Sequence, residues 1–357
     1  MEDRRASYHE IHMGKPAHGL VWGMDGGIGN GRPPTDASFE TRDGRQYLRS
    51  ASLAMMRRRQ KNQKPLFYVT QYNNVEYIES EDGDYDVFTW KTPLGCLTGR
   101  RRMNHFEEYP VKTVDDIAAW TCVHRNMAFT PNPAWLKNND PASMKSFGIN
   151  WSPVQHLLQF DTGIENFHFF LQDAPEAMAE LIAVMQDRCM ERLRLGLSMF
   201  PNAGWIYWGE NTSSSSISPS QYRQFSMRHV REYADMIHAS GKRLIVHMCG
   251  LLKALLDCFP ETGMDGIDSA TPPPIGDAPY DVIHAKFKRP DLTIVGRLNA
   301  QLWVGKTKEQ IQATLRETMF PGLVETPFCL MVTSDALPDI PARDAHTVYE
   351  ALESMTW

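Results

Sequence analysis

The segment RLIVHMCGLLKALLD, Arg243–Asp257, indicates the fold of this chain most directly. Apolar and β-branched residues lead into His247, Cys249 and Gly250, and an amphipathic run follows at once, which predicts a buried strand that turns into a helix. Because successive side chains of a strand point to opposite faces, His247 and Cys249 should share one side of the strand end. An imidazole and a thiolate together form a soft ligand pair that favours zinc. The alternative is a buried histidine beside an inert core cysteine.

The composition sets broad limits on the class of protein. A chain of 357 residues can hold two average domains or one large α/β barrel with an extension. A hydrophobic content of 42% is sufficient for a sizeable core, and a formal net charge of −6 argues against a nucleic-acid-binding protein. The basic run Arg57–Lys64 is short and is interpreted as a solvated helix end.

Cysteine usage and hydropathy indicate the compartment. The six cysteines are widely spaced and no signal peptide precedes them, which suits free thiols in a reducing compartment. No apolar run reaches the roughly 18–20 residues needed to cross a bilayer. We therefore expect a soluble, cytoplasmic protein.

The first third of the chain differs from the rest in composition and in the pattern of predicted elements. Residues 1–45 are rich in Gly, Pro and polar residues, and Gly23–Asp36 is predicted to be an irregular loop whose glycines do not match a dinucleotide fingerprint. Arg45–Gln63 is predicted to be helical, and residues 66–110 contain strand-like pieces separated by turn signals. From Val111 onward the pattern becomes strand then helix, repeated.

The second part of the chain contains short apolar strand candidates, several of which end in polar residues. They are Phe147–Trp151, Gly204–Asn211, Arg243–Gly250, Met264–Thr271, Leu292–Ala300 and Phe328–Asp335. The helical stretches between them include Pro175–Met199, Pro219–Ser240 and Thr307–Met319. This alternation predicts a parallel sheet covered by helices, and the number of repeats favours a closed (β/α)8 TIM barrel. We expect an N-terminal extension over residues 1–107 that packs on a catalytic barrel over residues 108–357.

Barrels of this kind carry their chemistry where the strands end. The residues at the predicted strand ends are Glu210, Asn211, His247, Cys249, Asp268, Arg297, Asn299, Thr333 and Asp335. Burying so many polar groups without partners would be costly, so a polar pocket with a metal explains them together. Taken singly, Asp268 or Asp335 could cap a helix and Arg297 could pair with a carboxylate. Trp208 shares a strand face with Glu210 and suits an aromatic ligand, although strand tryptophans usually lie in the core.

Several segments resemble the uroporphyrinogen decarboxylase superfamily, especially its zinc-dependent, corrinoid-linked methyltransferase branch. They are EYPVKTVDDIAAW (Glu108–Trp120), ISPSQYRQFSMRHVREYADMIHASGKRLIVHMCG (Ile217–Gly250), VGRLNA (Val295–Ala300) and TSDALP (Thr333–Pro338). The resemblance covers about residues 108–345, and its His-x-Cys-Gly piece is the most diagnostic. It implies a TIM barrel with a metal site at His247 and Cys249.

Two departures from the family pattern refine the expected chemistry. Decarboxylases of the superfamily carry an arginine-rich N-terminal segment, whereas Gly19–Pro34 holds a single arginine, Arg32, so porphyrinogen decarboxylation is not favoured. The methyltransferases complete their zinc site with a second cysteine at the end of the last strand, and aligning that element places Asp335 there. Cys329 lies about six residues earlier, some 20 Å from the strand end at roughly 3.3 Å per residue. The resemblance thus implies Asp335 as third ligand and Cys329 as a core thiol.

A carboxylate in place of a thiolate gives a harder zinc that suits an ether oxygen. We therefore expect methyl transfer from a methoxylated aromatic ether to the cobalt of a corrinoid protein. Glu210 is the candidate fourth ligand or nearby acid–base group, and the substrate contacts are expected from Trp208, Asn211, Asp268, Arg297 and Asn299. The chain has no cobalamin-binding Asp-x-His-x-x-Gly pattern, so the corrinoid should arrive on a partner protein or from solution.

Other functions stay open at this point. The rival reactions are methylcobamide:thiol methyl transfer of the coenzyme M type, methyl transfer to a folate, and a decarboxylase-like reaction. A non-catalytic subunit that merely binds a corrinoid or a substrate is a further alternative. The sequence leaves a homodimer open as well.

Overall fold

The computed structural model describes most of the chain, and every structural statement below concerns these residues. They are residues 4–17, 19–24, 39–42, 45–48, 66–102, 105–333 and 342–355. The chain forms two compact units, each described on its own: unit 1 comprises Met1–Met56, Ser213–Pro219 and Arg243–Trp357, and unit 2 comprises Arg57–Thr212 and Ser220–Lys242. The division at residues 107 and 108 stays a prediction.

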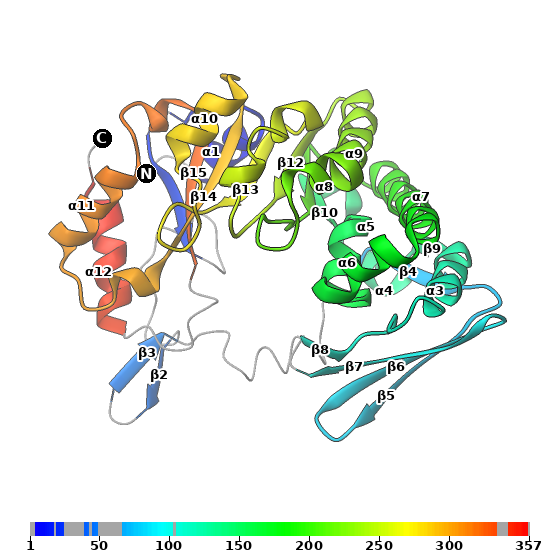
Figure 1. Cartoon of the computed structure of the whole chain (residues 1–357). Coiled ribbons are helices and arrows are strands. Elements are labelled where there is room, and N and C mark those ends of the chain that lie inside the picture. Colours follow the sequence, from blue (N-terminus) through cyan, green and yellow to red (C-terminus); the bar gives the residue numbers. More distant parts are fainter. Residues whose placement is uncertain are drawn as a thin grey trace. The chain divides into compact units, whose positions relative to one another are not determined.

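Unit 1 is built on parallel strands that come from both ends of the sequence. They are β1 (Val21–Met24), β12 (Arg243–His247), β13 (Gly266–Ala270), β14 (Thr293–Asn299) and β15 (Phe328–Thr333). Their order is β1-β15-β14-β13-β12 and neighbouring strands run parallel, so β1 lies beside β15 (Figure 1). All five residues of β13 are buried, as expected for a parallel strand covered on both faces.

The helices of unit 1 follow or flank these strands. They are α1 (Arg4–His12), α10 (Tyr280–Phe287), α11 (Lys308–Thr318) and α12 (Ala342–Glu353), and a separate hairpin pairs β2 (Phe39–Arg42) with β3 (Arg45–Leu48). A capping box at Thr307 and Gln310 begins α11. Ile11 of α1 lies in an apolar cluster with Val21, Val295, Cys329 and Met331, so this helix belongs to the core of unit 1.

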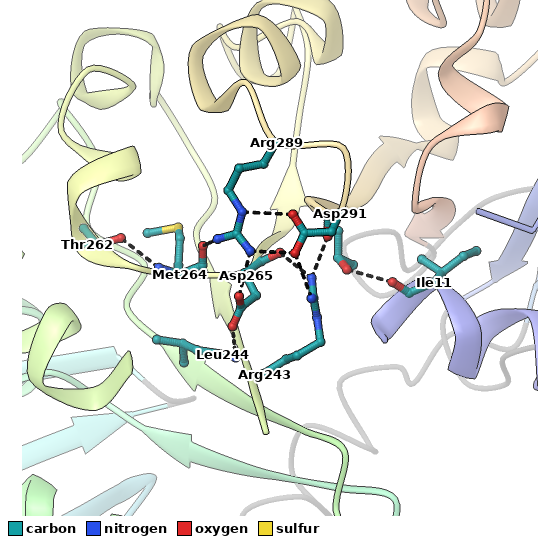
Figure 2. A network of polar contacts seen from close by, with 9 residues as sticks. Ile11, Arg243, Leu244, Thr262, Met264, Asp265, Arg289 and Asp291 are labelled. Carbon is teal, nitrogen blue, oxygen red and sulfur yellow. Dashed lines mark hydrogen bonds and ion pairs between the residues drawn. The ribbon is translucent and has the colours of Figure 1, made fainter. Parts of the chain in front are cut away.

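A polar network lies where β12, β13 and β14 begin (Figure 2). Arg289 pairs with Asp265 at 3.0 Å and with Asp291 at 2.7 Å, and Arg243 pairs with Asp291 at 3.2 Å. Thr293 Oγ1 donates to the Ile11 carbonyl at 2.7 Å and so fixes α1 to the same end. Each of the two arginines therefore has a carboxylate partner at the amino ends of the strands.

Unit 2 carries two antiparallel sheets and one parallel pair of strands. The larger sheet has the order β5 (Glu76–Asp82), β6 (Tyr85–Thr92), β7 (Gly95–Arg102) and β8 (His105–Glu108) (Figure 1). The second pairs β4 (Tyr68–Tyr72) with β9 (Met127–Pro131), and β10 (Ser146–Asn150) runs parallel to β11 (Trp205–Gly209). The strand pieces predicted within residues 66–110 are thereby confirmed.

Unit 2 also contains several helices. They are α3 (Asp116–Arg125), α4 (Pro133–Leu136), α5 (Pro153–His156), α6 (Ile164–Asp173), α7 (Pro175–Met199) and α9 (Met227–Ala239). The short helix α8 (Pro219–Gln221) begins at the last residue of a unit 1 segment and continues into unit 2 along the sequence. The helix predicted over Pro175–Met199 is confirmed with its bounds. Two segments are π-helical, Leu157–Asp161 and Tyr222–Ser226, so the predicted helix over Pro219–Ser240 is continuous but locally widened.

The predicted α/β class, with parallel strands followed by helices as in a TIM-barrel protein, is confirmed. The predicted helix from Arg45 is wrong at its start, because Arg45–Leu48 forms strand β3, and residues 49–65 lie outside the described part. Within the described residues, no helix is long and apolar enough to cross a membrane.

The helix expected directly after Gly250 is also wrong. The chain makes two short 3₁₀ turns instead, Lys253–Leu255 and Phe259–Thr262. The carboxylate of Asp277 accepts hydrogen bonds from the backbone N–H groups of Leu252 and Lys253, at 2.6 and 2.9 Å. These bonds hold the segment in a tight turn, so the apolar run packs without a regular helix.

Candidate active site

Three neighbouring strands of unit 1 bring a histidine, a carboxylate and a guanidinium together. His247 is the last residue of β12 and lies opposite Asp268 of β13 in the strand register. The His247 Nδ1 and Asp268 Oδ2 atoms are 2.6 Å apart, and Arg297 Nη2 of β14 lies 3.8 Å from Asp268 Oδ1. The predicted convergence of these three residues is therefore present within unit 1.

The backbone departs from regular strand geometry beside this cluster. Ser269 has a φ of 71° although it is not a glycine, and the pairing of β13 with β14 shifts between Asp268 and Ala270. A β-bulge of this kind changes the direction of neighbouring side chains and is frequent next to functional sites. The Asp268 carbonyl accepts from the Met248 N–H at 2.9 Å, which fixes the carboxylate's strand against the chain that follows His247.

Cys249 lies close to His247, but the sequence argument for this was wrong. Strand β12 ends at His247, so Cys249 lies in the turn beyond it and not on the alternating face of the strand. Gly250 makes this turn with a φ of +91°, and a Cβ there would lie 3.2 Å from the Ser213 Cβ. The half-buried Cys249 side chain hydrogen-bonds His247, so the turn still brings the two side chains together.

The electrostatics of this cluster favour a charged pair. Burial lowers the pKa of His247, but hydrogen bonds with Asp268 and Cys249 outweigh it and raise the pKa to about 9. Burial likewise opposes ionisation of Asp268, yet its bond to His247 and the Arg297 charge lower the pKa of this carboxyl group. Asp268 thus orients the imidazole through Nδ1, the arrangement in which Nε2 of a histidine binds a metal.

A further titratable group, His12, lies near Asp268 and escaped the sequence analysis. His12 of α1 is fully buried, and its Nδ1 is 2.9 Å from the Tyr8 carbonyl oxygen. Burial lowers its pKa to about 4, and the Asp268 carboxylate acts on it in the opposite direction. No local signal marks His12, because its placement depends on how α1 packs against strands almost 300 residues away in the chain.

The remaining predicted residues of unit 1 fall into two groups. Cys329 of β15 is buried in the apolar cluster around Ile11, as expected of a core thiol, and burial raises its pKa. Asn299 and Thr333 end β14 and β15, but their side chains are not among the described parts. Asp335 lies outside the described residues, as do Arg32 and most of the loop Gly23–Asp36.

Glu210, Asn211 and Trp208 belong to unit 2. Glu210 directly follows β11 and is fully buried; Thr212 Oγ1 donates to its Oε1 at 2.9 Å. Burial raises the pKa of Glu210 to about 7, against hydrogen bonds from Ser152 and Thr212 that lower it. Asn211 adopts a φ of 43°, a left-handed conformation that asparagine tolerates. That Glu210 shares a site with His247 stays a prediction.

Trp208 packs in the interior of unit 2. Its ring stacks on that of Tyr233 in α9, with the ring centroids 3.6 Å apart, and its side chain is 0% exposed. This is the packing position that strand tryptophans usually occupy. Its assignment as a substrate contact stays a prediction.

A zinc site at His247 and Cys249 is chemically consistent with these surroundings. The donor set is an imidazole held by a carboxylate at Nδ1 together with a thiol, which is typical of zinc. Within the part of the chain that the structure describes, no group of three or more His, Cys, Asp or Glu side chains could hold a metal. The expected third ligand, Asp335, lies outside that part. No disulfide joins any of the six cysteines.

Polar clusters at the carboxyl ends of parallel strands are the usual place of chemistry in α/β barrel enzymes. The family model for uroporphyrinogen decarboxylase (URO-D) matches residues 151–355 of this chain. The match covers more than half of the sequence and includes His247, Cys249, Asp268 and Arg297. The chain therefore belongs to the uroporphyrinogen decarboxylase family.

Solved structures provide distant likenesses. A methyltransferase from Methanosarcina mazei is 12% identical, with 70% of this chain and 71% of that chain covered and a TM-score of 0.47. The YdjI aldolase from Escherichia coli K12 is 10% identical, with 60% and 90% covered and a TM-score of 0.23. The IOLI protein with a bound zinc atom is 9% identical, with 58% and 96% covered and a TM-score of 0.21. No curated protein matches the chain.

Proposed function

We propose that this chain is a zinc-dependent methyltransferase of the uroporphyrinogen decarboxylase family. In the proposed reaction, a methyl group passes from a methoxylated aromatic ether to the cobalt of a corrinoid protein. The observation that carries the proposal is the 2.6 Å contact between His247 Nδ1 and Asp268, beside Cys249 at the carboxyl end of a parallel strand. A carboxylate that orients a histidine next to a thiol is the arrangement of a metal site more than of a packing contact.

Each residue of the cluster has a proposed part. His247 and Cys249 would hold the zinc, and Asp335, which follows β15 in the sequence, would be the third ligand. When bound, zinc supplies a Lewis acid that polarises the ether oxygen. Asp268 holds His247 by a hydrogen bond at Nδ1. Arg297 and Asn299 would orient the substrate, because their strand β14 lies next to the strand of Asp268.

Glu210 is proposed to handle the proton of the leaving group. The methyl–oxygen bond of the ether would break as the methyl group passes to Co(I) of the corrinoid, and the phenolate oxygen that leaves would take up a proton. A carboxyl group with a pKa near 7 is protonated in part at neutral pH and can supply it. Asn211 comes next in the chain and is a proposed substrate contact.

The corrinoid is expected on a partner protein, and we expect the pair to act in the cytoplasm. Methyl transfer from methylcobalamin to a thiol is the rival reaction, because the same histidine and cysteine could also hold a zinc that activates a thiolate. A folate is the alternative methyl acceptor. The two directions differ in which cobalamin species is consumed, which makes them separable by absorbance.

The decisive assay offers the purified protein cob(I)alamin with guaiacol and, separately, methylcobalamin with thiols or a folate. We expect methylcobalamin and the demethylated phenol to form from guaiacol, and His247→Ala to abolish the reaction. Cys96→Ala is the matched control, because Cys96 is an exposed cysteine on β7. Turnover of methylcobalamin with thiols or folate alone would contradict the proposed direction.

A further inference from the structure

Unit 2 contains a cavity of about 320 Å³ that involves none of the residues discussed for methyl transfer. Its volume lies within the range of small-molecule sites. Ten of the twenty-one described lining residues are Phe, Tyr or Trp, including Trp90, Trp120 and Trp151. The rings of Trp90 and Trp120 meet edge to face with centroids 4.9 Å apart, so these walls support each other. Walls of this kind suit a flat, apolar molecule.

Three arginines also line the cavity, and two of them have carboxylate partners. Arg101 pairs with Asp86 at 3.0 Å, and Arg188 pairs with Glu191 at 2.7 Å. The one carboxylate among the described lining residues, Asp161, is held by His156 at 2.8 Å. The lining therefore carries more positive than negative charge, which favours an anionic ligand.

Arg192 differs from the other two arginines. Its guanidinium lies 3.4 Å from the Tyr68 hydroxyl and 3.1 Å from Cys189 Sγ, with the Phe129 ring centroid at 5.5 Å. Among the described residues, no carboxylate lies within 4.0 Å of it, and its buried Nε has no hydrogen-bond partner. Arg192 is half-buried, so its guanidinium is partly withdrawn from water without a counter-ion, and this favours an anionic ligand beside it.

Two more features of the lining indicate a binding site. His124 is buried, and neither of its ring nitrogens has a partner within the described part of the chain. Burial lowers its pKa, so the ring is neutral and offers one donor and one acceptor. His156, Phe160 and Asp161 lie at or beside the π-helical turn Leu157–Asp161, a distortion that is frequent at functional sites.

We propose that this cavity binds a small, flat carboxylate: the aromatic walls cover its ring, and Arg192 receives its carboxylate. Arg192 is suited to this because a guanidinium matches a carboxylate with two parallel hydrogen bonds. Among the described lining residues, Asp161 is the one carboxylate that could compete for Arg192, and it is paired with His156. The proposal does not depend on methyl transfer, since it requires no metal and no methoxy group.

The test measures binding to the full-length protein by calorimetry, with benzoate, the isosteric neutral benzamide, and acetate as probes. We expect benzoate to bind at least tenfold more tightly than either benzamide or acetate, because only benzoate has both the ring and the charge. A charge-assisted pair of hydrogen bonds is sufficient for that difference. Benzoate should also change the tryptophan fluorescence, since three tryptophans line the cavity.

Arg192→Gln should weaken benzoate binding at least tenfold and leave benzamide binding unchanged. Arg194→Gln is the matched control, because Arg194 is exposed on the same helix. This variant should bind benzoate as tightly as the wild type does. Arg192→Lys keeps the charge but not the paired geometry, so its affinity for benzoate should lie between those of the wild type and Arg192→Gln. This variant also provides the test if Arg192→Gln fails to fold. Equal affinities for benzoate and benzamide, no benzoate binding, or an Arg192→Gln protein that binds as the wild type would each overturn the proposal.

Discussion

The two ends of the parallel strands in unit 1 carry different kinds of polar cluster. At the amino ends, Arg243 and Arg289 pair with Asp265 and Asp291, and Asp265 Oδ2 also accepts the Leu244 N–H at 2.8 Å (Figure 2). At the carboxyl ends, His247 meets Asp268 beside a bulge with a left-handed serine.

The difference between the two clusters indicates a structural role at the amino ends of the strands and a functional role at their carboxyl ends. In the amino-end network carboxylates and guanidinium groups pair with one another, and none of its four charged residues has a positive φ. The carboxyl-end cluster adds a thiol, a histidine whose pKa is raised, and strain in the chain, which are features of sites that bind or react. We therefore expect substitutions at the amino ends to change stability, and substitutions at the carboxyl ends to change metal binding and activity.

The largest effect is expected for the two proposed ligands. His247→Ala and Cys249→Ala should each remove the zinc and abolish methyl transfer, while the unfolding transition stays close to that of the metal-free wild type. The reason is that neither side chain lies in the apolar core of unit 1, since both are only half-buried. Metal content by elemental analysis and thermal unfolding check this. Full activity of a zinc-free Cys249→Ala protein would refute the metal's role.

The opposite result is expected at the amino ends of the strands. Asp265→Ala should lower the free energy of unfolding by about 1–3 kcal/mol, because it leaves the Leu244 N–H without its acceptor and removes one of the two carboxylates that pair with Arg289. Denaturant unfolding measures this. The folded variant should keep the zinc content of the wild type, and a selective loss of zinc at unchanged stability would overturn the comparison.

Glu210→Gln should affect both activity and the pH dependence of stability. The folded pKa of Glu210 is raised, to about 7 from 4.5, so its contribution to stability is complete below pH 4.5 and is lost as the pH rises through 7. Glutamine cannot ionise, so the variant should gain up to about 3 kcal/mol over the wild type above pH 7.

Activity should fall about a hundredfold in the same variant, and less for ethers whose phenolates leave easily. Urea unfolding at several pH values and rates with a series of ethers measure the two effects. Unchanged rates with every ether would show that Glu210 has a structural role and no part in the reaction.

Asp268→Asn should give the smallest of these effects. The amide keeps the shape of the carboxylate but weakens its hold on His247 Nδ1, and loss of such an outer partner costs roughly tenfold to a hundredfold in metal affinity. Zinc competition with a chromophoric chelator measures the change. Cys329→Ser should leave zinc affinity unchanged, because Cys329 lies in the apolar cluster.

Much of the fold could be predicted from the sequence. Buried parallel strands are short apolar runs, so β11 to β15 are predicted to within a few residues, and helix α7 is predicted with its bounds. The convergence of His247, Asp268 and Arg297 followed from the rule that functional residues lie at strand ends. The relation of Asp268 to His247, however, depends on the strand register and the bulge, which no local pattern encodes.

The features that could not be predicted depend on distant packing. The cavity in unit 2 combines Trp90, Trp120, Trp151 and Arg192, which come from four separate elements or turns and look like ordinary core and surface residues in the sequence. The turn at Gly250 was misjudged because its geometry depends on Ser213 and Asp277, far away in the chain. Spacing along the sequence carries no information on such contacts.

The central claim is that His247 and Cys249 are ligands of a zinc at the carboxyl end of β12. X-ray absorption at the zinc edge of the loaded protein tests it most directly, because sulfur and nitrogen or oxygen ligands differ in distance, about 2.3 Å against about 2.0–2.2 Å. We predict about one zinc per chain with one sulfur ligand, and Cys249→Ala should lose this sulfur signal together with the zinc. A zinc without sulfur, or a sulfur signal unchanged in Cys249→Ala, would contradict the account.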